Sequence, residues 1–221
     1  DKYSKNNTDL PHMLPDSKVW EKILSSLGIS NNDKVIIYDH SDVISSCRCW
    51  YNFIYFGHDP NLVSVLNGGL TKWKLEGRPI TANKTKILKS NYISLEKKNL
   101  VKDINQIKQN INQKKFVLID ARSRERFEGK VAELRKNVRS GSIPNSLCLP
   151  FKDIINEDNT FKKVDEISKI FDQIIDLKYK NLVFSCGSGV TACVLALAYS
   201  LVNNTYSPTI YDGSWVEYGK I

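Results

Sequence analysis

The residues of this chain best suited to chemistry are a cysteine and the glycine-containing stretch it begins, residues 186–191. The apolar run before it, residues 182–185, is typical of a buried strand, and the apolar run after it of a buried helix. Gly187 and Gly189 allow a tight turn whose N–H groups point inward, in front of the partial positive charge of a helix N-terminus. A thiol in that setting readily becomes a thiolate, which is the nucleophilic form. The pattern therefore predicts that Cys186 is a catalytic nucleophile.

Three other interpretations of this stretch stay open. A cysteine in front of a helix can simply be a packing residue. A cysteine phosphatase also has a cysteine-initiated anion loop, but that chemistry needs an arginine closing the loop around phosphate, and Ala192 stands there. A non-catalytic binding module is the third, and the intact loop argues against it. An activity assay separates the last interpretation from an enzyme.

Apolar periodicity along the chain predicts helices that alternate with strands, which is typical of an α/β fold with a largely parallel sheet. Strands are expected at residues 35–39, 62–66, 116–120 and 182–185. Helices are expected at residues 17–27, 45–56, 99–112, 154–177 and 192–201, and after the turn at 67–69. A long charged loop is expected at residues 121–142, and the polar, basic residues 81–91 resemble a linker.

The chain also contains an internal repeat. Residues 66–73 resemble residues 211–218, and an apolar strand lies upstream of each copy. Aligning those strands places Asp39 where the second copy has Cys186. The sequence therefore predicts two copies of one α/β unit, of which only the second carries the nucleophile. The first copy is short at its front, so we expect the chain to begin inside that unit.

Composition bounds the remaining functions. The formal net charge of +8 comes from lysines and arginines spread along the chain, so a solvated basic surface is favoured over nucleic-acid binding. The five cysteines are an odd number without a dense framework, which favours a reducing compartment over a disulfide scaffold. Cys47 and Cys49 have no matching Cys/His pair, so zinc is not expected. No apolar run reaches the length of a membrane span.

Four motifs in order carry a family resemblance: residues 11–15 (PHMLP), Arg126 with Phe127 to Gly129, the loop 186–191 (CGSGVT) and residues 212–217 (DGSWVE). Together with the tandem units, they resemble the rhodanese-type sulfurtransferases, and the loop is most similar to that of the 3-mercaptopyruvate sulfurtransferases. The resemblance implies an α/β fold of two tandem rhodanese-like domains, each a mainly parallel sheet flanked by helices. Residues 1–80 would form a non-catalytic domain, 81–98 a linker and 99–221 the catalytic domain.

The resemblance also implies roles for individual residues. Cys186 would carry sulfur as a persulfide, taken from 3-mercaptopyruvate with release of pyruvate and passed to a thiol, such as thioredoxin, or to cyanide; thiosulfate is the alternative donor. The donor would be bound by Arg126 and Arg135 and by the loop residues Gly187, Gly189, Val190 and Thr191. Ser188, His12 and Asp1 would form a proton relay.

No cofactor, metal, nucleic acid or membrane partner is implied by the resemblance, and a cytoplasmic location is expected, with the mitochondrion as the alternative. Two departures from the family pattern concern the arginine loop. Ser142 stands where a histidine is common, and Glu133 and Leu134 precede Arg135 in place of a usual proline.

Overall fold

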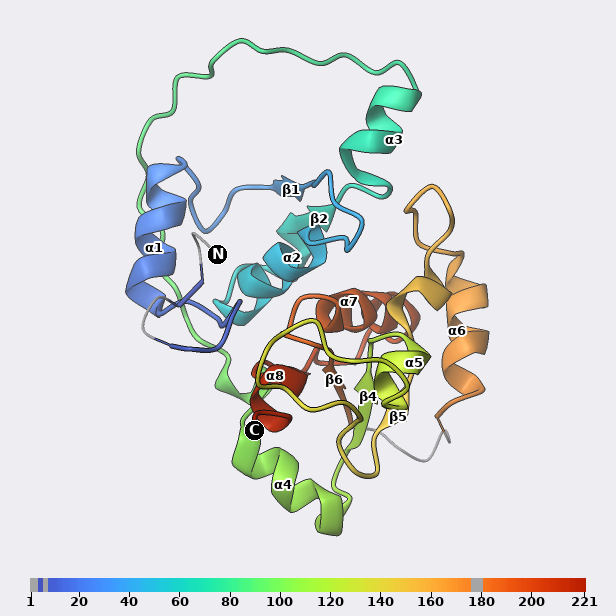
Figure 1. Cartoon of the computed structure of the whole chain (residues 1–221). Coiled ribbons are helices and arrows are strands. Elements are labelled where there is room, and N and C mark those ends of the chain that lie inside the picture. The colour runs from blue at the N-terminus through green and yellow to red at the C-terminus, as the bar shows by residue number, and fades with distance from the viewer. Residues whose placement is uncertain (1–3, 6–7, 176–180) are drawn as a thin grey trace.

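The computed structural model describes residues 4–5, 8–175 and 181–221 of the chain (Figure 1). Two sheets are present among these residues, and every strand pair in them is parallel. The first sheet has two strands, β1 (Val35–Ile37) and β2 (Val63–Val65). The second has five, in the order β3-β7-β6-β4-β5. Their bounds are β3 (Val101–Lys102), β4 (Val117–Asp120), β5 (Leu147–Cys148), β6 (Leu182–Ser185) and β7 (Ile210–Tyr211). The expected α/β architecture is confirmed.

Helices connect the strands and cover the sheets. In the first unit they are α1 (Ser17–Ser26), α2 (Ser46–Tyr55), the 3₁₀ helix η1 (Pro60–Leu62) and α3 (Gly69–Leu75). In the second they are η2 (Lys98–Leu100), α4 (Ile104–Gln113), α5 (Arg124–Phe127), η3 (Phe151–Ile154), α6 (Val164–Asp172), α7 (Ala192–Val202) and α8 (Ser214–Tyr218). No helix among the described residues is long and apolar enough to cross a membrane.

The five-stranded sheet is buried on both faces, as parallel sheets usually are. Side chains alternate along β4: Ile119 faces the large core that α2, α6 and α7 share, whereas Leu118 faces a smaller core. That smaller core includes Ile107 of α4 and Trp215 of α8. Figure 1 shows α2 of the first unit lying against α7 of the second, so the two units share one large core.

Two helix predictions were wrong in their bounds. The helix expected at residues 99–112 begins only at Ile104, because Val101 pairs with Ile210 in the sheet and Asp103 then caps the helix by accepting a hydrogen bond from the Gln106 N–H. The helical stretch expected at 154–177 is limited to α6. Residues before it turn back on themselves through a bridge between Ile155 and Phe161, and residues 176–177 lie outside the described residues. The predicted loop 121–142 contains the short helix α5.

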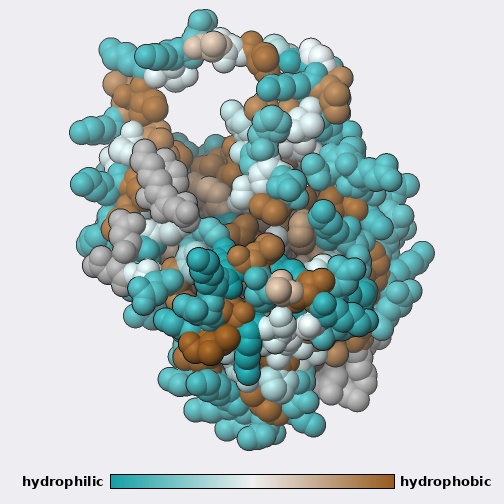
Figure 2. Space-filling model, viewed as in Figure 1, coloured by the Kyte–Doolittle hydropathy of each residue, from teal (hydrophilic) through white to brown (hydrophobic). Residues whose placement is uncertain are grey.

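The segment predicted as a linker arches over the first unit after α3 and leaves an opening in the molecular surface (Figures 1 and 2). Its second half packs on the first unit. The Ser90 N–H donates to the Ser25 carbonyl, and the Leu95 N–H to the Phe56 carbonyl. Tyr92 is buried and its ring stacks on His58. This half of the segment is therefore held against α1 and the end of α2 in the first unit.

Candidate active site

Cys186 follows β6 directly, at the carboxyl end of the central strands, which is where ligands bind in parallel α/β sheets. The Gly189 N–H donates to its Sγ at 3.1 Å. Gly189 has φ +81°, and a side chain there would also collide with the Asp212 carbonyl, so glycine is required. The backbone thus turns around the sulfur as the sequence predicted, with at least one amide aimed at it.

Residues 212–217, here called the closing motif, hold this loop in place by hydrogen bonds. The amide N–H groups of Trp215 and Val216 donate to the carbonyls of Cys186 and Gly187, at 2.9 and 3.0 Å. The hydroxyl of Ser214, which is fully buried, accepts a hydrogen bond from the Cys186 N–H. Every polar backbone group of Cys186 is therefore fixed by α8 or its first residue, which orients the sulfur.

Ser188 lies between a histidine and an arginine. His12 Nδ1 is 2.9 Å from its hydroxyl oxygen, and Arg135 Nη2 donates to the same oxygen at 3.3 Å. Since an arginine only donates, the Ser188 oxygen accepts from Arg135 and its own proton can be donated to Nδ1 of a neutral His12. Burial, and then the positive charge of Arg135, lower the pKa of His12 below 6.5, which favours that neutral form.

The long charged loop carries several arginines that their charge pattern alone does not distinguish. Arg122 is 1% exposed and is used internally: it pairs with Asp120 and Glu133 and lies under the Trp215 ring. Arg126 pairs with Glu133 at 2.6 Å but stays 22% exposed, and its Nη2 lies 3.1 Å from where a Gly187 side chain would start. Arg126 can therefore reach a bound molecule above the cysteine loop, whereas Arg122 cannot.

These residues meet in one cleft of about 580 Å³ between the two units. Its walls include eight of the residues predicted for the site: His12, Arg126, Arg135, Cys186, Gly187, Ser188, Val190 and Thr191. Gly189 lies behind the sulfur rather than on the wall. Asp1 lies outside the described residues. Among the described residues no three His, Cys, Asp or Glu side chains gather as a metal site would require.

Two functional neighbours were not singled out from the sequence. Glu133 stood out only as a departure from a family motif, although it orients both Arg122 and Arg126. Arg48 reaches the cleft from α2 and pairs with Asp212. The sequence contained an indication of this. Arg48 is flanked by Cys47, Cys49 and aromatic residues on a predicted helix, and a buried arginine in such a segment requires a partner.

The other four thiols differ from Cys186 in their surroundings. Burial raises the pKa of Cys47 well above its usual value and that of Cys193 to about 12. Burial also raises the pKa of Cys49 and of Cys148 to about 11. Cys49 lines the same cleft as Cys186, yet a thiol with so high a pKa is a poor nucleophile at neutral pH.

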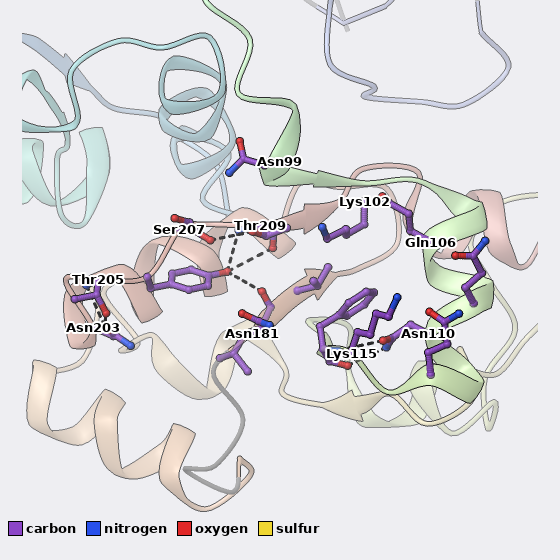
Figure 3. A pocket seen from close by; sticks show the side chains of 16 residues that line it. Asn99, Lys102, Gln106, Asn110, Lys115, Asn181, Asn203, Thr205, Ser207 and Thr209 are labelled. Carbon is purple, nitrogen blue, oxygen red and sulfur yellow. Dashed lines mark hydrogen bonds between the residues drawn. The ribbon is translucent and has the colours of Figure 1, made fainter.

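A second hollow, of about 480 Å³, lies at the opposite end of the second sheet (Figure 3). Its walls come from the residues that begin β4 and β6, such as Phe116 and Leu182, together with amide side chains of α4. Figure 3 shows Lys102 and Lys115 there among asparagine and glutamine side chains, without a thiol or a histidine. The groups suited to chemistry are thus concentrated in the cleft at the carboxyl ends of the strands.

The fold and the cleft define an α/β protein with a cysteine anion loop in the second of two related units. The model of the rhodanese-like domain matches residues 5–76 and 103–220. The chain is 38% identical to thiosulfate/3-mercaptopyruvate sulfurtransferase 1, mitochondrial, of Arabidopsis thaliana, over 99% of this chain and 62% of that protein. It is 35% identical to the 3-mercaptopyruvate sulfurtransferase of Homo sapiens, over 99% of this chain and 73% of that protein.

A solved structure has the same fold over nearly the whole chain. The Tum1 protein from Saccharomyces cerevisiae superposes with a TM-score of 0.88 at 28% identity, over 99% of this chain and 76% of that one. The chain therefore belongs to the rhodanese family, with rhodanese-like sequence in both halves. The predicted family and the two-unit organisation of the fold are confirmed. The chain spans less than two thirds of the Arabidopsis relative.

Proposed function

We propose that this chain is a sulfurtransferase that takes sulfur from 3-mercaptopyruvate onto Cys186 and passes it to a thiol or to cyanide. The observation that carries the proposal is the cleft itself. The Cys186 sulfur lines it and accepts a hydrogen bond from the Gly189 N–H. Arg126, Arg135 and the Ser188–His12 pair line the same cleft. Relatives named as 3-mercaptopyruvate and as thiosulfate sulfurtransferases support the reaction class and leave the donor open.

The proposed reaction balances without an external oxidant or reductant. The Cys186 thiolate attacks the donor sulfur, a sulfur–sulfur bond forms, and the carbon–sulfur bond breaks. The electron pair of the broken bond moves into the enolate of pyruvate, whose carbon then takes the proton that the donor thiol carried. The outer sulfur remains on Cys186 as a persulfide anion, which the loop amides stabilise. An acceptor thiolate or cyanide removes that sulfur and regenerates the thiolate, so the cycle is ping-pong.

The two arginines suit a keto acid. Arg135 donates to the Ser188 hydroxyl and forms no ion pair among the described residues, so its charge is available to a carboxylate. Arg126 is already paired with Glu133, which orients its free edge over Gly187. The carboxylate also offsets part of the positive charge that Arg126 presents to a donor. A carboxylate on Arg135 would place the keto oxygen near Ser188. There the hydroxyl can donate its proton to the developing enolate oxygen in place of His12 Nδ1.

The preference for mercaptopyruvate over thiosulfate rests on the two residues after the nucleophile. Thiosulfate is a compact dianion without a carbonyl, and cationic side chains beside the cysteine would bind it best. Gly187 and Ser188 are small and neutral instead. A side chain at 187 would begin 3.1 Å from Arg126 Nη2, so a cation there would crowd that guanidinium.

Mass spectrometry after incubation with mercaptopyruvate tests the reaction. We expect one added sulfur on the peptide that contains Cys186, removed by a thiol or by cyanide, and no added sulfur in Cys186→Ser. Absence of the modification would overturn the proposed function. The kcat/KM ratio for mercaptopyruvate and thiosulfate, measured with one acceptor, tests the donor. A higher value for thiosulfate would overturn the donor assignment alone.

The acceptor and the compartment remain part of the proposal. We propose a thiol such as that of thioredoxin as the acceptor, and a reducing interior, cytoplasmic or mitochondrial, which would keep the five thiols reduced. Sulfur transfer to reduced thioredoxin, followed as sulfide release, tests the acceptor. If cyanide but not thioredoxin removes the sulfur, the protein acceptor is wrong.

A further inference from the structure

Arg48 is a buried cation that crosses from the first unit to the second. It lies in the first turn of α2 and is 9% exposed. Its Nη2 atom pairs with Asp212 Oδ1 at 2.7 Å, and Asp212 belongs to the closing motif just after β7. A buried arginine needs such a partner, but the ion pair alone adds little net stability because both groups lose water. Its remaining hydrogen bonds therefore indicate what the arginine does.

Those bonds go to the backbone carbonyls of two residues of the site. Nη1 donates to the Gly189 carbonyl at 3.0 Å, and Nη2 donates to the His12 carbonyl at 2.8 Å. Gly189 is the residue whose N–H faces the Cys186 sulfur, and His12 is the residue whose ring faces Ser188. One guanidinium thus joins the sulfur-binding loop of the second unit to the imidazole supplied by the first.

The backbone of His12 needs this support. Its φ is +61°, in the left-handed region that a residue with a side chain occupies only when its surroundings impose it. Arg48 holds its carbonyl, and Asp212 Oδ2 accepts a hydrogen bond from the Leu14 N–H at 2.9 Å. The Arg48–Asp212 pair therefore binds the His12 segment at two points and the cysteine loop at one.

We propose that Arg48 is a positioning residue for sulfur transfer, which holds the Gly189 amide and the His12 imidazole in register across the cleft. The inference rests on the proposed function. It gives the first unit, which has no nucleophile, a specific role, because α2 presents the group that aligns the catalytic loop. Although Arg48 reaches the cleft, its guanidinium is bound to two carbonyls and to Asp212 rather than to the sulfur, so its effect should fall on turnover more than on donor binding.

Arg48→Lys is the first test, since lysine keeps the charge but cannot donate to both carbonyls and to Asp212 in the same planar geometry. We expect kcat to fall about a hundredfold, as for a small displacement of reacting groups. KM for mercaptopyruvate should change by less than about threefold, because Arg126 and Arg135 are untouched. Ile54→Val, on the same helix and buried, is the matched control: it loses core contacts but should keep kcat. An equal loss of kcat in both variants, or a loss confined to KM, would overturn the proposal.

A double variant separates positioning from simple charge neutralisation. Arg48→Met with Asp212→Asn removes both buried charges but keeps a side-chain oxygen that can accept from the Leu14 N–H. Such a neutral replacement of an ion pair is usually well tolerated by the fold. We expect a thermal midpoint near that of the unmodified protein with kcat still about a hundredfold lower. Recovery of kcat in the double variant would show that Arg48 merely neutralises Asp212.

A measurement without a sulfur donor distinguishes this inference from the proposed function. The rate at which iodoacetamide alkylates Cys186, followed on its peptide by mass spectrometry at neutral pH, reports on the loop alone. We expect a rate at least about threefold lower in Arg48→Lys and unchanged in Ile54→Val. If the unmodified protein transfers no sulfur from mercaptopyruvate, the proposed function fails while this rate still decides the role of Arg48. An unchanged alkylation rate in Arg48→Lys overturns the positioning role.

Discussion

The two halves of the chain are built on one plan, and their hydrogen bonds show the register. In the first unit the Leu70 N–H donates to the Asp39 carbonyl at 2.8 Å, and in the second the Trp215 N–H donates to the Cys186 carbonyl at 2.9 Å. Each donor lies at the start of a helix, α3 or α8, that follows the second strand of a parallel pair. Asp39 therefore occupies in the first unit the position that Cys186 occupies in the second.

The difference at that position is the side chain that the same turn carries in each unit. The Asp39 carboxylate accepts from the Ser46 N–H and the Ser45 hydroxyl, so it holds its own loop at the start of α2. The Cys186 sulfur accepts from the Gly189 N–H and lines the cleft. The same turn is thus closed by a carboxylate in one copy and surrounds a nucleophile in the other. The repeated fold therefore places Asp39 and Cys186 at equivalent turns, and their side chains give the two turns different properties.

The two sheets also differ in how far other elements bury their outer faces. The middle residue of β1, Ile36, is 63% exposed, whereas Val183 at the matching place in β6 is 1% exposed. Val183 packs under α4 and α8, with Ile107 and Trp215. Nothing comparable covers Ile36 among the described residues. Equal hydrophobicity in the two copies therefore does not mean equal burial, and the second copy is the one stabilised on both faces.

The largest expected effect tests the cysteine position itself. Cys186→Ser should reduce sulfur transfer by at least about 10⁴-fold, because it removes the atom that forms the persulfide. Cys49→Ser is the matched control, since its thiol lines the same cleft, and it should keep most of the activity. Steady-state assays with mercaptopyruvate measure both. Retained turnover in Cys186→Ser would break the assigned difference between the two units.

Next in size is the loss of a donor-binding arginine. Arg126→Ala should lower kcat/KM for mercaptopyruvate about ten- to a hundredfold, because a charge-assisted contact contributes about 1.5–3 kcal/mol. Arg135→Ala should act in the same direction. Arg124→Ala is the control: it lies on the same short helix, is 59% exposed and pairs with Asp153. Equal kinetics for Arg126→Ala and Arg124→Ala would show that the loop arginines only face solvent.

A smaller effect sharpens the comparison of the two sheets. Val183→Ala should lower the free energy of unfolding by about 2 kcal/mol, since it leaves a cavity in a two-sided core. Ile36→Ala should lower it by less than about 0.5 kcal/mol, because that side chain is mostly exposed already. Urea unfolding of both variants measures the difference. A large loss for Ile36→Ala would mean that the outer face of β1 is covered in solution.

The smallest expected effect concerns pH. Burial and the charge of Arg135 lower the pKa of His12 from 6.5, which favours the neutral imidazole at pH 7. The acid limb of kcat should therefore lie below 6.5. Arg135→Gln removes one cause and should raise the pKa of His12, moving that limb to higher pH. A limb that stays in place in Arg135→Gln would exclude His12 as the titrating group, whereas Arg124→Gln should leave it unchanged.

The features that could be predicted from the sequence are those set by interactions between residues close together in the chain. A glycine turn between an apolar strand and an apolar helix predicts the cysteine loop, because local sterics and burial need no distant partner. The same holds for the repeat, whose alignment of Asp39 with Cys186 matches the equivalent hydrogen bonds from Leu70 and Trp215. The elements predicted wrongly were those with distant partners: Val101 belongs to a strand only because Ile210 lies beside it.

Which arginines face the cleft and which are paired inside the protein follows from the tertiary structure and not from the charge pattern. Arg122 and Arg126 are four residues apart with the same side chain, and one is fully enclosed by Asp120 and Glu133 while the other faces the cysteine loop. Arg48 and Asp212 are separated by most of the chain and meet behind Gly189. Charge pattern cannot predict such pairs, because the energy of a buried ion depends on the partners that the fold brings within hydrogen-bond distance and on the water that it removes.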